Sequence, residues 1–275
     1  MIEILKAILF GIVEGITEWL PISSTGHMIL LDEFIRLDVS SEFMEMFRVV
    51  IQLGAILAVV VLFFSKIFPF NFDKTKGPFI KKDIFVLWFK IIVACIPAAI
   101  IGVLFDDVFE ELFYNYQVVA AMLILFGILF IVIEKRNQNL KPKIKSLSEI
   151  TYTTAIWIGV FQLIAAIFPG TSRSGATILG ALLIGVSRTV AAEFTFFLAI
   201  PVMLGASLLK LVKFGLAFTA TEAVILLVGM VVAFIVSIVV IRFLMDFIKK
   251  HNFIVFGWYR IILGILVLLY FGING

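Results

Sequence analysis

Two short polar stretches of this chain carry residue types that could transfer a phosphoryl group. The first, EGITEWLPISSTGH, runs from Glu14 to His27. On a helix, Glu14 and Glu18 share one face because they are four residues apart. Pro21 ends that helix, and Ser23, Ser24, Thr25 and then His27 follow. Carboxylates, hydroxyls and an imidazole around a break in the backbone indicate acid–base or nucleophilic chemistry.

The second stretch, PGTSRSG, covers residues 169–175 and is followed by Ala176 and Thr177. Its Arg173 guanidinium stays charged and offers a planar fork of donors that suits phosphate oxygens. The next helix would also present its N-terminus, which favours anions. We therefore predict a phosphate or diphosphate site here. The residues expected to help bind it are Gly170, Thr171, Ser172, Ser174 and Thr177, with Ser23 and Thr25 of the first stretch.

The rest of the chain is strongly apolar. Of its 275 residues 63% are hydrophobic, and the mean hydropathy is +1.19. This composition predicts a polytopic membrane protein and excludes a soluble domain. The single cysteine, Cys95, excludes a disulfide framework. No nucleic-acid partner is expected. Ionisable groups are costly inside a bilayer, so both polar stretches are candidate functional sites.

The hydropathy pattern predicts an all-α, polytopic integral membrane protein, with residues 1–275 in a single membrane domain. Each polar stretch joins two helices too short to span, so each is expected to form a re-entrant hairpin. Six full transmembrane helices complete the fold. The hairpins are expected over 1–37 and 150–186, and the spans over about 46–64, 84–105, 116–134, 189–209, 222–245 and 253–273.

The two halves of the chain, 1–136 and 150–275, read as a repeat. Gly11-Ile-Val-Glu14 matches Gly159-Val-Phe-Gln162, and Pro21 and Pro169 follow at equal distances. Basic loops mark the cytoplasmic side. This rule places the lysine-rich loop 65–83 and the basic loop 135–149 in the cytoplasm, and the acidic loop 106–115 outside. The halves then begin on opposite sides, which is the inverted repeat that places a site near the midplane.

The residue types suggest roles but leave alternatives. Arg173 is expected to stabilise the transferring phosphoryl group; otherwise it forms a structural ion pair with Glu14 or Glu18. Ser24 is the candidate nucleophile, with His27 as its base or as the acid for the leaving group. Activated water could attack instead, and the hydroxyls of this stretch could simply cap a helix.

The two carboxylates of the first stretch have two candidate roles. Glu14 and Glu18, together with phosphate oxygens, would suit Mg²⁺ or Ca²⁺, which prefer oxygen ligands. Glu18 could instead orient His27 or act as a base itself. The spacing does not decide between metal binding and proton transfer.

EGITEWLPISSTGH and PGTSRSGAT resemble the two signature motifs of undecaprenyl-diphosphate phosphatases, the bacitracin-resistance family of bacterial membrane enzymes. The stretches IQLGAILAV and AAEFTFFLAIP between them are similar as well. The resemblance implies hydrolysis of undecaprenyl diphosphate to the monophosphate, recycling the lipid carrier of cell-wall synthesis. It also implies a divalent cation and, in the plasma membrane, a site that opens to the outer face. The matching functional residues are Glu14, Glu18, Ser23, Ser24, Thr25, His27, Ser172 and Arg173.

A transporter is the main alternative, because inverted repeats with broken helices are typical of alternating-access carriers. A lipid-phosphate flippase would explain Arg173 and the symmetry. It would explain less well why Glu18, Ser24 and His27 cluster on one hairpin, since transport needs binding and not an acid–base set. In either case the expected partners are a polyprenyl diphosphate lipid and the bilayer, and small-residue helix faces would allow a homodimer.

Overall fold

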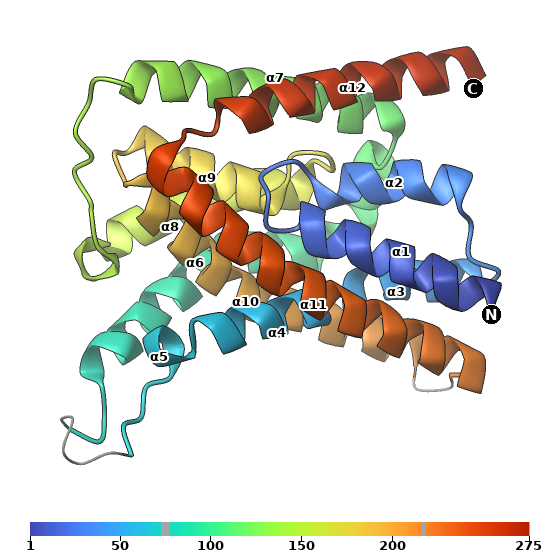
Figure 1. Cartoon of the computed structure of the whole chain (residues 1–275), viewed down its shortest axis with the longest axis horizontal. Coiled ribbons are helices and arrows are strands. Elements are labelled where there is room, and N and C mark those ends of the chain that lie inside the picture. The colour runs from blue at the N-terminus through green and yellow to red at the C-terminus, as the bar shows by residue number, and fades with distance from the viewer. Residues whose placement is uncertain (73–77, 216–217, 275) are drawn as a thin grey trace.

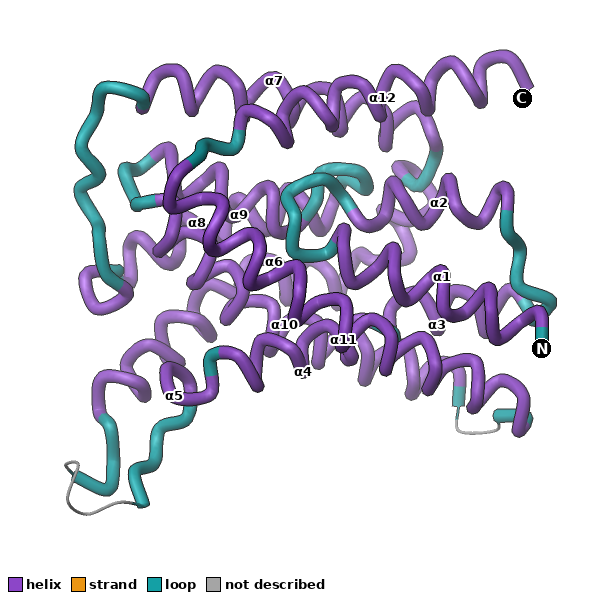
Figure 2. The backbone as a smooth tube through the Cα atoms, viewed as in Figure 1, coloured by secondary structure: helices purple, strands orange, loops and turns teal. Residues whose placement is uncertain are grey.

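The computed structural model describes residues 1–72, 78–215 and 218–274. These residues form helices joined by short connections, and their only β pairing is two isolated bridges (Figures 1 and 2). The all-α prediction is confirmed. The helices of the first half are α1 (Ile2–Thr17), α2 (Ser24–Phe34), α3 (Ser41–Val50), α4 (Gln52–Leu62), α5 (Phe64–Ile67), α6 (Lys82–Phe113) and α7 (Tyr116–Asn137).

The second half repeats the alternation of short and long helices. A 3₁₀ turn over Leu147–Glu149 precedes it, and the helices are α8 (Tyr152–Ile167), α9 (Arg173–Leu183), α10 (Arg188–Phe214), α11 (Ala220–Lys250) and α12 (Ile254–Asn274). The short pairs α1/α2 and α8/α9 lie at the two predicted hairpins. Their re-entrant path through a bilayer stays a prediction.

Six helical stretches of the described chain are long and apolar enough to cross a membrane, as predicted. α3 and α4 together supply the first of them. The stretches are Ser41–Leu62, Lys82–Gly102, Tyr116–Asn137, Arg188–Phe214, Ala220–Lys250 and Ile254–Ile273. Large apolar side chains remain exposed along these helices, for example Leu227 at 62% and Val239 at 63%. Such a surface is suited to lipid and not to water.

The expected acidic loop over 106–115 is wrong for most of its length, because α6 continues to Phe113. Phe105, Phe109 and Phe113 recur every four residues, and each ring lies about 6.0 Å from the next. Aromatic pairs at this spacing stabilise a helix, so they extend α6 past its apolar part. In the predicted loop 65–83, residues 73–77 lie outside the described chain.

The long helices pack reciprocally across the two halves. α1 packs against α11 of the second half, α8 packs against α6 of the first half, and α7 packs against α12. Figure 1 shows α7 and α12 side by side along the top of the molecule. This exchange is what a two-fold repeat of 1–136 and 150–275 would produce, although the repeat itself stays a prediction.

Two glycines matched between the halves lie at these crossings. A Cβ atom on Gly11 would be 2.6 Å from the Gly229 carbonyl oxygen of α11. A Cβ atom on Gly159 would be 2.3 Å from the Ala94 carbonyl oxygen of α6. Small residues let helix backbones approach closely in membranes. Gly11 and Gly159 are therefore explained by the same requirement, the close approach of a helix from the other half.

We expect Gly159→Ala to lower the free energy of unfolding by about 2 kcal/mol, because the methyl group forces α8 away from α6. Gly205→Ala in α10 is the matched control, since nothing lies within 4 Å of the added methyl group. Thermal unfolding in detergent measures both changes. Equal midpoints for the two variants would contradict the close approach of α6 and α8.

Candidate active site

The helices α2 and α9 begin with the same turn. Their N-cap residues, Ser23 and Ser172, have φ angles of 74° and 69°, and no other non-glycine residue of the described chain has a positive φ. Each serine hydroxyl accepts a hydrogen bond from a backbone N–H three residues on, that of Gly26 at 3.3 Å and of Gly175 at 3.1 Å. These two hydroxyls are helix caps. For Ser23 and Ser172, the alternative that the hydroxyl only caps a helix is therefore confirmed.

Glu18 joins the two polar stretches. The Ser24 hydroxyl donates to its Oε2 at 2.7 Å, and the Arg173 Nη2 donates to its Oε1 at 2.7 Å. The Ser174 hydroxyl donates to the Glu18 backbone carbonyl at 3.0 Å. One carboxylate thus contacts a hydroxyl on its own hairpin and a guanidinium on the other. This arrangement places a proton acceptor and a fixed positive charge beside one hydroxyl.

The Arg173 guanidinium is held on several sides. Its Nη1 donates to the Thr195 carbonyl at 3.0 Å, and it lies over the Trp19 ring at 6.0 Å from the centroid. Its side chain is only 14% exposed. The ion pair with Glu18, considered as an alternative from the sequence, is present. It fixes the guanidinium on the same carboxylate that accepts the hydrogen bond of the Ser24 hydroxyl.

Glu14 lies one helical turn before Glu18 and is buried. Its Oε1 has no hydrogen-bond partner in the described chain, and the nearby charges acting on it are those of Glu18 and Arg173. No cluster of three or more potential metal ligands occurs among the described residues. Two carboxylates, one with a free oxygen, still fit Mg²⁺ or Ca²⁺ if phosphate and water supply the remaining ligands.

His27 binds groups other than the Ser24 hydroxyl. Its Nδ1 is 2.7 Å from the Ser23 carbonyl oxygen, so Nδ1 carries the proton and donates. Its Nε2 is 2.7 Å from the Tyr259 hydroxyl, and the two rings stack at 5.6 Å. Ser24 is therefore paired with Glu18 as its proton acceptor. The role of His27 as acid for the leaving group stays a prediction.

Several residues predicted to bind diphosphate face the protein interior instead. The Thr177 hydroxyl is buried; it donates to the Arg173 carbonyl at 2.9 Å and contacts the Thr195 hydroxyl at 2.9 Å. Thr171 is fully buried. Gly170 has φ +87°, and a Cβ there would be 2.5 Å from the Val119 carbonyl oxygen. Their part in substrate binding stays a prediction.

Arg260 of α12 was not among the predicted site residues. It is fully buried and donates to the backbone carbonyls of Pro21 at 3.2 Å, Gly170 at 2.9 Å and Thr171 at 2.8 Å. One guanidinium thus ties the two polar stretches together. A lone arginine inside the last apolar span was the sequence signal that could have identified it, as could the adjacent Tyr259.

We expect Arg260→Met to lower kcat/KM by about a hundredfold, because the freed carbonyls let both stretches shift relative to each other. It should also lower the thermal midpoint, since buried carbonyls lose their donors. Arg242→Met, on an exposed residue of α11, is the control. Arg260→Lys separates positioning from mere stability: a lysine that restores the midpoint but not kcat supports a positioning role. A wild-type kcat/KM in Arg260→Met would contradict it.

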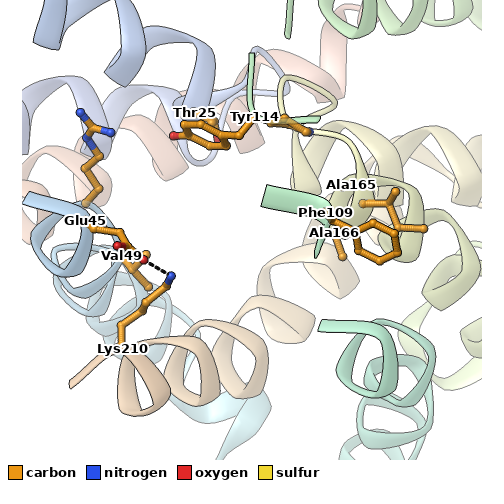
Figure 3. A pocket seen from close by; sticks show the side chains of 11 residues that line it. Thr25, Glu45, Val49, Phe109, Tyr114, Ala165, Ala166 and Lys210 are labelled. Carbon is orange, nitrogen blue, oxygen red and sulfur yellow. Dashed lines mark hydrogen bonds and ion pairs between the residues drawn. The ribbon is translucent and has the colours of Figure 1, made fainter. Parts of the chain in front are cut away.

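A cavity of about 250 Å³ opens beside Thr25. Figure 3 shows Thr25 and Tyr114 on one side of it and the ion pair between Lys210 and Glu45 on another. Phe109 of α6 forms part of the opposite wall. Thr25 follows Ser24 in the chain, but the side chains of Glu18, Ser24, His27 and Arg173 do not line this cavity.

Residues 7–266 match the family described as Bacitracin resistance protein BacA. This match covers nearly the whole chain, including both polar stretches and Arg260. The chain belongs to this family.

Close relatives agree over almost their full length. A protein of Desulfitobacterium hafniense named undecaprenyl-diphosphatase is 71% identical, over 98% of this chain and 97% of that protein. Undecaprenyl-diphosphatase 1 of Clostridium acetobutylicum is 68% identical over 98% of both chains. An undecaprenyl-diphosphatase of Enterococcus faecalis is 65% identical over 98% of this chain and 97% of its own. The resemblance inferred from the motifs is confirmed.

Proposed function

We propose that this protein is an integral membrane phosphatase that hydrolyses undecaprenyl diphosphate to undecaprenyl phosphate and inorganic phosphate. The observation that carries the proposal is the contact of Glu18 with both Ser24 and Arg173. Relatives at 65–71% identity bear the name of this activity. Recycling of the lipid carrier for cell-wall synthesis and resistance to bacitracin would follow from it.

The geometry supports a phosphoserine route. Ser24 Oγ attacks the terminal phosphorus while its proton passes to Glu18 Oε2. The bond between that phosphorus and the bridging oxygen breaks, and undecaprenyl phosphate leaves. Water then attacks the phosphoserine phosphorus, the bond to Ser24 Oγ breaks, and Glu18 returns its proton to that oxygen, so phosphate leaves with the protons of the water and the hydroxyl is restored. Arg173 is fixed beside both steps, where its donors stabilise charge on the phosphoryl oxygens.

Glu14, through its free Oε1, would hold a divalent cation, together with Glu18 before Glu18 takes the Ser24 proton. When bound, Mg²⁺ or Ca²⁺ would neutralise charge on the diphosphate. The residues of the chain supply the remaining functions: Glu14 contributes a free carboxylate oxygen in a buried position, and Arg173 keeps the neighbouring carboxylate in place.

We expect Glu14→Gln to raise the Mg²⁺ or Ca²⁺ concentration needed for half-maximal activity by about tenfold. Losing a carboxylate that binds the metal, directly or through a ligand, typically weakens metal affinity by about that factor. Chelator should abolish activity in wild type. The measurement is phosphate release against metal concentration, with Glu33→Gln on the surface as control. If Glu14→Gln lowers kcat at every metal concentration without shifting the midpoint, Glu14 is not a metal ligand.

The cavity beside Thr25 supports an opening to the outer face of the plasma membrane. Its wall includes Phe109 and Tyr114, next to the acidic end of α6. The basic loop 135–149 lies at the other end of α7. Basic segments favour the cytoplasmic side, so the cavity would face outward.

The test is phosphate release from undecaprenyl diphosphate by protein purified in detergent. Equal amounts of phosphate and undecaprenyl phosphate are expected. A carrier needs a sealed bilayer, whereas a phosphatase does not. If no phosphate appears with or without added divalent cation, the enzyme proposal fails. Lipid transport in sealed vesicles would then be measured instead.

A further inference from the structure

A second cavity, of about 480 Å³, lies far from the active site. The C-terminal ends of α7, α9 and α11 and the loop from α7 to α8 surround it, and these segments converge at the left of Figure 1. We call it the basic pocket because five basic side chains and a single acidic one line it. The basic residues are Arg136, Lys141, Lys143, Arg188 and Lys249.

The basic pocket is independent of the catalytic residues. α9 connects the two places: Arg173 is its first residue, and Leu183, its last, lines the pocket. A helix of 11 residues is about 16 Å long. In the described chain, no residue that lines the pocket forms a hydrogen bond with Glu18, Ser24 or Arg173, so a ligand here would be additional to the substrate.

The one acidic side chain of the pocket is already used. Glu134 is buried and accepts from Arg188 Nε at 2.9 Å, and it also accepts from the Phe253 backbone N–H at 3.0 Å. This fork holds Arg188 in a fixed orientation. Glu134 therefore has no capacity left to neutralise the other basic groups.

The remaining positive charge is unbalanced. Lys249 pairs with Asp246 at 2.8 Å. Glu149, in the adjoining loop, does not line the pocket, and its carboxylate accepts hydrogen bonds from the Lys145 N–H at 2.8 Å and the Ser146 hydroxyl at 2.9 Å. Three basic residues make no ion pair within the described chain: Arg136, Lys141 and Lys143. A hollow with one sign of charge attracts an anion.

The rim of the pocket is held by backbone hydrogen bonds. The Lys143 N–H donates to the Gly185 carbonyl at 2.8 Å, and the Ser187 N–H donates to the Ile144 carbonyl at 2.9 Å. Ser187 is the N-cap of α10 but makes no side-chain hydrogen bond to its first turn. The N–H groups of that turn add to the positive potential. The pocket is thus pre-organised for an anion.

Apolar side chains complete the wall, among them Ile184, Val186, Ile248 and Leu140, which is 61% exposed. We propose that the basic pocket binds the phosphate headgroup of an anionic lipid in the leaflet at this end of the protein. Basic pockets between transmembrane helices have this chemistry. Free inorganic phosphate shares the same recognition, but the apolar wall favours a ligand with an acyl chain.

The test is native mass spectrometry of delipidated protein in detergent, titrated with phosphatidylglycerol. A second arm uses inorganic phosphate, and a third uses zwitterionic phosphatidylethanolamine. The pocket variant combines Arg136→Gln, Lys141→Gln and Lys143→Gln. The control variant, with equal loss of charge outside the pocket, combines Lys82→Gln, Lys135→Gln and Lys145→Gln. Thermal unfolding and phosphate release in detergent check that both variants fold; if the triple variant does not, the exposed Lys141→Gln and Lys143→Gln are used singly.

The proposal predicts saturable binding of phosphatidylglycerol that weakens by about tenfold or more in the pocket variant and little in the control. Binding of inorganic phosphate alone, with the same dependence on the pocket residues, would support phosphate recognition but overturn the lipid as its source. Equal losses of affinity in the two variants, or no binding of either ligand, would overturn the proposal that the basic pocket is an anion site. Phosphate release should be the same in wild type and pocket variant, whichever outcome is found.

Discussion

Replacing Arg173 by alanine is expected to lower kcat/KM for undecaprenyl diphosphate by about 10³-fold or more, the scale for a lost arginine that stabilises a transferring phosphoryl group. The guanidinium is fixed by Glu18 and the Thr195 carbonyl, so its position does not depend on the substrate. Its loss also leaves Glu18 without its counter-charge. Initial rates of phosphate release measure the effect.

Arg173→Lys refines the same prediction. Lysine keeps the charge but loses the planar fork, so it cannot contact Glu18, Thr195 and a phosphate oxygen together. We expect kcat/KM to fall by about 10²-fold, as it does when one hydrogen-bond donor to the transition state is removed. Arg36→Lys, on an exposed residue, is the control. If Arg173→Lys retained full activity, the guanidinium would serve only as a buried positive charge.

Replacing Glu18 by glutamine is expected to have the second large effect on the rate. Glutamine has nearly the same shape but cannot take the Ser24 proton, so we expect kcat to fall by about 10³-fold, within the range for a lost general base. At saturating divalent cation KM should change less, because Arg173 is still held by the Thr195 carbonyl and remains to bind the diphosphate. Steady-state kinetics in detergent separate the two constants.

Glu45→Gln provides the matched control for Glu18→Gln. Glu45 is a carboxylate at the cavity beside Thr25, and it pairs with Lys210. Its replacement should leave kcat within about threefold of wild type, because exposed ion pairs contribute little. A Glu18→Gln enzyme with wild-type kcat would show that Ser24 loses its proton to another group, and His27 would again be the candidate.

The meeting of Glu18 with Arg173 could be anticipated from the sequence, because neither charge can stay unpaired in an apolar chain. The six membrane spans also follow from hydropathy alone. The helical end of α6 could not be read this way, since Phe105, Phe109 and Phe113 extend a helix through residues that hydropathy assigns to a loop. The acidic residues of 106–115 therefore led to a predicted end of this helix that is too early.

The partners of His27 and Ser24 depend on features that a sequence does not contain. The positive φ at Ser23 turns its carbonyl toward His27, and α12 brings Tyr259 to the other ring nitrogen. Arg260 likewise acts through packing between the last helix and two distant turns. Only the fold decides that Ser24 contacts Glu18.

The most direct test of the account is the rate of phosphate release from undecaprenyl diphosphate by Ser24→Ala, compared with Thr25→Ala at the next position. Ser24 is paired with Glu18, whereas Thr25 lines the adjoining cavity. We predict a loss of about 10³-fold or more for Ser24→Ala and about tenfold for Thr25→Ala. If Ser24→Ala retained more than a tenth of wild-type activity, attack by the Ser24 hydroxyl would be contradicted, and water activated by Glu18 would replace it as the nucleophile.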